Sequence, residues 1–161
     1  MAERPVVNAS PLILLSRANW LHLLRLAGDT IVVPSAVADE IQARGPDDPT
    51  SVALATNDWL TIEDAGPVPS VISNWDLGPG ESSVLAWAMA HPGSEAILDD
   101  LAGRRCARSL GIPVRGTLGL VLVAKLRGTI PAARPVIEAL RQSGMYLSDV
   151  VVNQALKQVG E

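Results

Sequence analysis

The chain has 161 residues, of which 48% are hydrophobic, and a formal net charge of −4. This length supports one well-packed core but not two, so a single domain over residues 1–161 is predicted. The longest apolar run, residues 118–124, is far too short to span a bilayer and the first residues lack a signal-peptide pattern, which excludes a membrane protein and predicts a cytoplasmic one.

The distribution of charge is more informative than its sum. Residues 1–100 contain four basic and fourteen acidic side chains, whereas residues 101–143 contain eight basic and one acidic. A basic segment beside an acidic remainder suits a protein that binds a phosphate backbone next to a carboxylate site. The alternative is an ordinary solvated surface on the later helices. The lone Cys106 excludes an intrachain disulfide, and the two histidines lie too far apart in sequence to favour a zinc cluster.

The first half of the chain alternates short apolar runs with amphipathic runs, which predicts strands alternating with helices. In chain order we expect a strand at 4–8, a helix capped by Ser10 and starting at Pro11, a second helix ending before Gly28, a strand at 30–33, a helix starting at 34–35, a helix at 51–58 and an edge strand at 60–63. Residues 64–76 are expected to form a long connection.

The second half repeats the alternation. In chain order it predicts a helix over about 81–91, a strand at 96–98, a helix at 101–110, a strand starting at 112, a helix ending at Gly128, and helices at 133–142 and 149–158. Five strands alternating with helices predict an α/β fold with a mainly parallel central sheet.

Polar side chains follow the ends of two predicted strands. Asn8 ends the first strand, and the Asp99–Asp100 pair ends the strand at 96–98. The carboxyl ends of parallel strands share one sheet edge, where Glu40 and Glu81 can approach from neighbouring helices. Such oxygens suit Mg²⁺ or Mn²⁺, and such an ion can activate water for phosphodiester hydrolysis. We therefore predict that Glu40, Glu81, Asp99 and Asp100 are catalytic and that these four and Asn8 hold the metal.

Each of these residues also has a purely structural explanation. Asp100 can cap the following helix, and Glu81 can interact with the dipole of its own helix. Glu40 can be an exposed helical glutamate, and Asn8 can be a turn residue. Only their joint placement at strand ends and adjoining helices favours a site. The basic segment supplies four residues predicted to bind a nucleic-acid phosphate backbone: Arg104, Arg105, Arg108 and Arg115.

Several motifs in order make the sequence resemble the PIN-domain proteins, and more narrowly the VapC-like toxins of that superfamily. They are Val7-Asn8-Ala9-Ser10-Pro11-Leu12, Pro34 with Val37-x-x-Glu40, Leu77-Gly-Pro-Gly-Glu81, Leu98-Asp-Asp100 with Ala107-Arg108 and Leu110-Gly111, Gly116-Thr-Leu-Gly119 and Tyr146-Leu-Ser-Asp149. The resemblance covers nearly the whole chain.

The resemblance implies a three-layer α/β/α sandwich and a Mg²⁺- or Mn²⁺-dependent ribonuclease. It also implies a toxin that forms a homodimer and has an antitoxin protein as partner. By position it assigns the acidic site to Glu40, Glu81 and Asp99 or Asp100, with Ser10 as a supporting hydroxyl.

Asn8 stands where typical members have their first aspartate. An amide can offer its oxygen to a metal ion, but it brings no negative charge to hold the ion. The alternative to an active ribonuclease is therefore a catalytically silent PIN-like module that binds RNA or an antitoxin.

Overall fold

The protein is described by a computed structural model that covers residues 3–161. Across these residues the chain forms a five-stranded sheet in which all neighbouring strands are parallel, in the order β3-β2-β1-β4-β5. The strands are β1 (Val6–Val7), β2 (Ile31–Pro34), β3 (Leu60–Glu63), β4 (Ala96–Ile97) and β5 (Val114–Arg115). The predicted α/β fold with a parallel sheet is confirmed.

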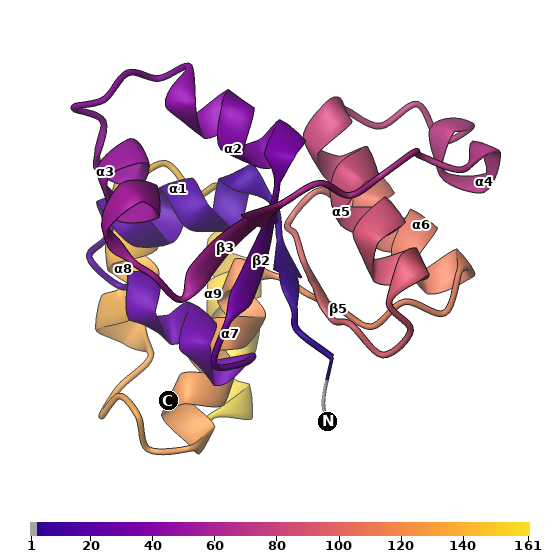
Figure 1. The fold of residues 1–161 in the computed structure, drawn as a ribbon. Coiled ribbons are helices and arrows are strands. Elements are labelled where there is room, and N and C mark those ends of the chain that lie inside the picture. Colours follow the sequence, from indigo (N-terminus) through magenta and orange to yellow (C-terminus); the bar gives the residue numbers. More distant parts are fainter. Residues whose placement is uncertain (1–2) are drawn as a thin grey trace.

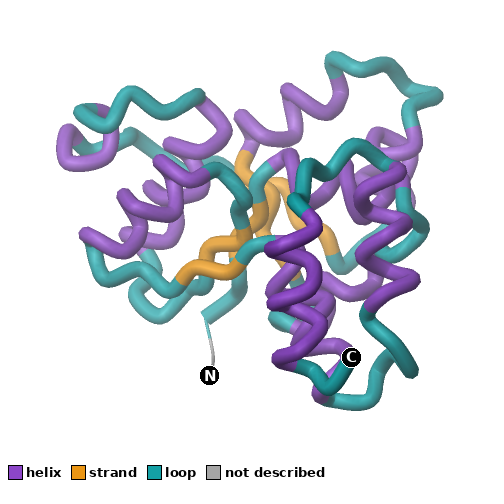
Figure 2. The backbone as a smooth tube through the Cα atoms, turned by 180° about the vertical axis from the view of Figure 1, so that it is seen from behind, coloured by secondary structure: helices purple, strands orange, loops and turns teal. Residues whose placement is uncertain are grey.

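Helices cover both faces of this sheet, as Figures 1 and 2 show. They are α1 (Ala9–Arg17), the 3₁₀ helix η1 (Leu21–Leu26), α2 (Ser35–Gln42), α3 (Pro49–Thr56), α4 (Ser70–Ser73), α5 (Pro79–Ala90), α6 (Leu101–Ser109), α7 (Thr117–Leu126), α8 (Arg134–Gln142) and α9 (Asp149–Gln158). Helix α5 packs on β1, β2 and β4, with α6 beside it. Helices α1, α3 and α7 to α9 lie on the opposite side of the sheet from α5 and α6 in Figure 1. The result is a three-layer α/β/α arrangement.

The central strands are apolar throughout because both of their faces are covered. The side chains of β1, β2 and β4 are all buried, and Leu98 continues β4 into the core. A parallel strand that is buried on both faces needs such a continuous apolar run rather than alternation. The two edge strands depart from it: Ile62 of β3 is exposed, and both residues of β5, Val114 and Arg115, are only partly buried.

The strand order creates a crevice at one end of the sheet. From β1 the chain moves to one side through β2 and β3, then returns to the other side of β1 to form β4 and β5. Ligands of open α/β sheets bind at the carboxyl ends of the strands where the order reverses in this way. Here that position lies between β1 and β4, which Asn8 and Asp99 follow.

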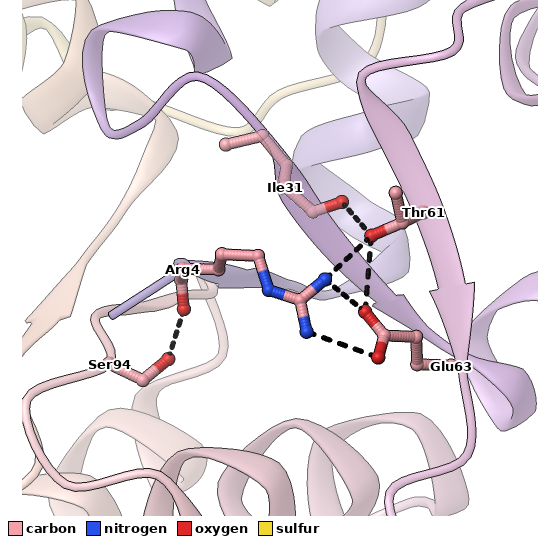
Figure 3. A network of polar contacts seen from close by, with 5 residues as sticks. All are labelled: Arg4, Ile31, Thr61, Glu63 and Ser94. Atoms are coloured by element: carbon pink, nitrogen blue, oxygen red, sulfur yellow. Dashed lines mark hydrogen bonds and ion pairs between the residues drawn. The ribbon is translucent and has the colours of Figure 1, made fainter. Parts of the chain in front are cut away.

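Arg4 joins the start of the central strand to the edge of the sheet, as Figure 3 shows. Its guanidinium donates to both carboxylate oxygens of Glu63 and to Thr61, while its carbonyl accepts a hydrogen bond from Ser94 at 2.6 Å. Arg4 also lies over the ring of Trp87 in α5, 5.4 Å from the ring centroid. The hydrogen bonds from Arg4 lower the pKa of Glu63.

Several predicted boundaries need correction. Helix α1 begins at Ala9, so Ser10 lies inside it and Asn8 is the cap residue. Helix α3 begins at Pro49 rather than 51 because Asp48 caps it by accepting a hydrogen bond from the Thr50 N–H at 3.0 Å. The short helix α4 interrupts the predicted connection at 64–76. Strand β5 starts at Val114 rather than 112, since the Ile112 N–H still bonds to Ala107 at the end of α6.

No helix among residues 3–161 has the length and apolar character that crossing a bilayer requires.

Candidate metal centre and nucleic-acid interface

Asn8 connects the central strand to the candidate site. Its backbone N–H donates to the Ile97 carbonyl at 2.9 Å, which ties the end of β1 to β4. Its side chain is 4% exposed and makes no capping hydrogen bond to α1. Buried side-chain amides normally have polar partners, so this side chain has capacity for another one.

The side-chain oxygens of Asn8 and Glu40 both lie next to Gly80. A Cβ atom on Gly80 would lie 3.1 Å from Asn8 Oδ1 and 3.6 Å from Glu40 Oε1. The two oxygens therefore border the same small volume, which is open because residue 80 has no side chain. A Cβ at residue 80 would crowd Asn8 Oδ1, so glycine favours this close approach, while its backbone angle is an ordinary one. Glu40 comes from the second turn of α2, and Gly80 lies in the first turn of α5.

Glu81 folds back over the start of its own helix. Its Oε2 lies 2.7 Å from the position that a Cβ on Gly78 would occupy, so the Glu81 carboxylate would have to shift if residue 78 carried a side chain. Glu81, Glu40 and Asn8 line one cavity of about 310 Å³, together with Ser10 and Arg17. Three of the five predicted ligands are thus brought to one cavity.

Asp99 is held by the start of helix α7. Its Oδ1 accepts a hydrogen bond from the Thr117 N–H at 2.7 Å, and its Oδ2 accepts one from the Thr117 hydroxyl at 2.8 Å. Ser10 also donates to Oδ2 at 3.4 Å. These hydrogen bonds at the N-terminus of α7 fix the position of the Asp99 carboxylate.

Asp100 turns away from Asp99. Its side chain caps α6 by accepting a hydrogen bond from the Gly103 N–H at 2.8 Å, and it is exposed. Asp100 is therefore a helix-capping residue, the structural alternative named for it above.

The predicted carboxylates do not form one cluster. Over residues 3–161, no three Asp, Glu, His or Cys side chains lie close enough together to hold a metal ion. Asp99 lines a second cavity of about 620 Å³, and Ser10 and Leu14 line both cavities. The acidic residues thus occupy two adjoining hollows at the carboxyl edge, with Asn8, Glu40 and Glu81 in one and Asp99 in the other.

The four predicted arginines also separate into two pairs. Arg104 and Arg115 line the cavity of Asp99, whereas Arg105 and Arg108 are exposed on α6 and do not line it. A Cβ on Gly116 would lie 3.0 Å from Asp99 Oδ1 and 3.2 Å from an Arg104 Nη1, so both groups approach this glycine. Arg115 also pairs with Glu95 at 3.2 Å.

A family model described as a PIN domain matches residues 4–161. The chain belongs to the PIN-domain family. No curated protein and no solved structure matches it significantly. The family match confirms the resemblance drawn from the ordered motifs, and it agrees with the parallel sheet and the surrounding helices. PIN domains have a nuclease-type fold and generally use divalent metal ions.

The oxygen groups of this PIN domain suit such an ion. Carboxylate and amide oxygens are the ligands that Mg²⁺ and Mn²⁺ prefer. The space beside Gly80, which a Cβ would fill, is bordered by one amide and one carboxylate oxygen. The residues present therefore fit a hard divalent cation held by Asn8 and Glu40, with Glu81 in the same cavity.

The sequence pattern missed one important residue of this PIN domain. Thr117 anchors Asp99 through both its N–H and its hydroxyl, yet it drew attention only as part of the Gly116-Thr-Leu-Gly119 motif. A usable signal was present, because a threonine directly after a strand and Gly116 marks the first turn of a helix. Tyr146 also lines the larger cavity and carried no predicted role.

Proposed function

We propose that this chain, acting as a single PIN-like domain in the cytoplasm, is a Mg²⁺- or Mn²⁺-dependent endoribonuclease. The observation that carries the proposal is that Asn8 Oδ1 and Glu40 Oε1 both border the space beside Gly80. Asn8 and Glu40 line the same cavity as Glu81. This cavity lies at the carboxyl edge of the sheet next to β1, where ligands of open α/β sheets bind.

Asn8, Glu40 and Glu81 would hold the metal ion, with Asp99 facing them from the adjoining cavity. A bound Mg²⁺ or Mn²⁺ supplies an activated water and offsets charge on a phosphate. Of the acidic pair we propose Asp99 rather than Asp100 for the site, because Thr117 and Ser10 orient Asp99 while Asp100 caps α6.

The chain's own residues would orient the RNA. Arg104 and Arg115 offer guanidinium groups to a phosphate in the cavity that Asp99 lines. Asp99 is held in position by Thr117 at the N-terminus of α7, so its carboxylate can accept a hydrogen bond from a group on the RNA without moving. Arg105 and Arg108, exposed on α6, would add only long-range attraction to the RNA backbone.

We further propose that the protein is the toxin of a toxin–antitoxin pair and forms a homodimer. Membership of the PIN-domain family and the sequence resemblance to VapC-like toxins support this proposal. Co-expression with the product of a neighbouring short reading frame tests it: an antitoxin should copurify with the protein and suppress cleavage. Light scattering of the purified protein should give the mass of two chains.

A specific observation favours a second function. The cation site has an amide where a carboxylate would add negative charge, and the described residues form no cluster of three acidic groups. The alternative is therefore a silent PIN-like module that binds RNA or an antitoxin without cleaving RNA.

Cleavage of a labelled RNA pool separates the two functions. We expect the wild type to cleave with Mn²⁺ and to stop when EDTA is added. Glu40→Gln should reduce the rate at least tenfold, because it removes a charged ligand from the site. Glu3→Gln is the matched control, since Glu3 is exposed and does not line the cavity of Asn8, Glu40 and Glu81. Absence of cleavage with retained RNA binding would favour the silent module.

A further inference from the structure

The cavity that Asp99 lines has one charged end. Arg104 Nε and Arg115 Nη1 are buried there, and neither has a hydrogen-bond partner among the described residues. A buried donor without a partner is costly, and a ligand with several acceptor oxygens would remove that cost. A phosphate group has this chemistry: it matches the charge of Arg104 and can accept from Nη1 of Arg115, whose other terminal nitrogen is paired with Glu95.

The remainder of the cavity is too large and too apolar for a phosphate alone. Its volume of about 620 Å³ lies within the usual range for small-molecule sites, and Leu118, Leu122 and Met145 form part of its wall. Gln154 of α9 also lines it and brings both a donor and an acceptor. The cavity thus combines a phosphate-binding end, an apolar wall and an amide.

Tyr146 stands at this cavity with its side chain in solvent. It is the only tyrosine of the chain, it lines the cavity, and it is 93% exposed. An aromatic ring that is so exposed adds almost nothing to the stability of the fold through burial. Its position is explained if the ring packs against a ligand.

We propose that this cavity binds one unpaired nucleobase of the RNA, next to a phosphate held by Arg104 and Arg115. This inference rests on the proposed function and locates the part of the RNA site that holds a base. Tyr146 stacks on the base and Gln154 offers its amide to the base edge. Unpaired bases are recognised in this way, by aromatic stacking together with contacts to their polar edges.

Fluorescence anisotropy with two labelled strands tests this proposal. One is a single-stranded RNA ten-mer of mixed sequence, and the other is the abasic ribose-phosphate strand of the same length. Binding is measured in EDTA so that cleavage does not interfere. We expect the wild type to bind the strand with bases about tenfold more tightly than the abasic strand, within the range for stacking a base on an aromatic ring.

Three variants make the result specific to Tyr146. Tyr146→Ala should lose the preference for bases, and Tyr146→Phe should keep it because the ring remains. Trp75→Ala is the matched control: Trp75 is also an exposed aromatic residue, but it does not line the cavity, so the preference should persist.

Equal affinity of the wild type for both strands, or an unchanged preference in Tyr146→Ala, would overturn the base site. Cleavage with Mn²⁺ is measured separately on the same preparations. A wild type that cleaves RNA but binds both strands equally would overturn only this inference, while a wild type that binds neither strand would overturn it together with the ribonuclease function.

Discussion

Asn8 is the residue on which the strength of the cation site depends. Its oxygen is directed to the space beside Gly80, but the amide contributes no charge there. The Asn8 oxygen has the position of a metal ligand, but a neutral amide binds a cation more weakly than a carboxylate does. A substitution that changes the charge but hardly the shape can therefore measure how far Asn8 acts as a ligand.

Asn8→Asp should tighten Mn²⁺ binding by on the order of 1 kcal/mol, because it adds a negative charge at ligand distance. Without metal the new carboxylate should lower the melting temperature, since it lies close to Glu40 around Gly80. Thermal unfolding with and without Mn²⁺ checks both effects, and cleavage should become faster. A variant that responds to Mn²⁺ as the wild type does would remove Asn8 from the site.

Neighbouring residues at a strand end can have separate roles, and Asp99 and Asp100 illustrate this. Asp99 is anchored by α7, whereas Asp100 caps α6. Asp100→Ala should lower the free energy of unfolding by about 1 kcal/mol, the usual effect of losing a helix cap. Calorimetric titration should show unchanged Mn²⁺ affinity.

Asp48→Ala is the matched control for Asp100→Ala, because Asp48 caps α3 through a similar backbone hydrogen bond. The two variants should lose similar stability and keep the same Mn²⁺ affinity. A lower affinity in Asp100→Ala alone would make Asp100 a metal ligand.

At the scale of elements, the ion pair of Arg4 and Glu63 fastens the edge strand β3 to the start of β1. Because Arg4 lowers the pKa of Glu63, the pair stabilises the fold above the ordinary glutamate pKa and this contribution is lost as the pH falls through the lowered pKa. Glu63→Gln should cost about 1 kcal/mol or less near neutral pH, since both side chains are partly exposed.

Melting temperatures at about pH 7 and about pH 3 check this dependence, the two values lying on either side of the ordinary glutamate pKa. The difference between wild type and Glu63→Gln should shrink at the lower pH. The double variant with Arg4→Met should lose little more than Glu63→Gln, because both changes remove the same interaction. A difference that persists unchanged in acid would show that the charge on Glu63 does not stabilise the sheet.

For the whole molecule, periodicity was enough to predict the fold but not its fine boundaries. Buried strands such as Ile31–Pro34 are marked by β-branched residues and a following helix start. The order of the strands depends on contacts between distant segments, which local periodicity does not contain. The four-residue helix α4 was missed because it is shorter than one apolar repeat.

The candidate site was predictable in composition rather than in detail. Strand ends locate Asn8 and Asp99 at one edge because a parallel sheet brings its carboxyl ends together. The sequence could not show that Asn8 and Glu40 border the same space beside Gly80, nor that Arg104 lines a cavity while Arg105 does not. Both depend on side-chain directions and on packing between distant elements.

The most direct test of the cation site is an anomalous difference map from crystals of the wild type grown with Mn²⁺. We expect a peak beside Gly80, within coordination distance of Asn8 Oδ1 and a Glu40 oxygen, and its loss in crystals of Glu40→Gln. A map with no peak in that cavity, or with Mn²⁺ bound only elsewhere on the molecule, would contradict the proposed metal centre and with it the ribonuclease function.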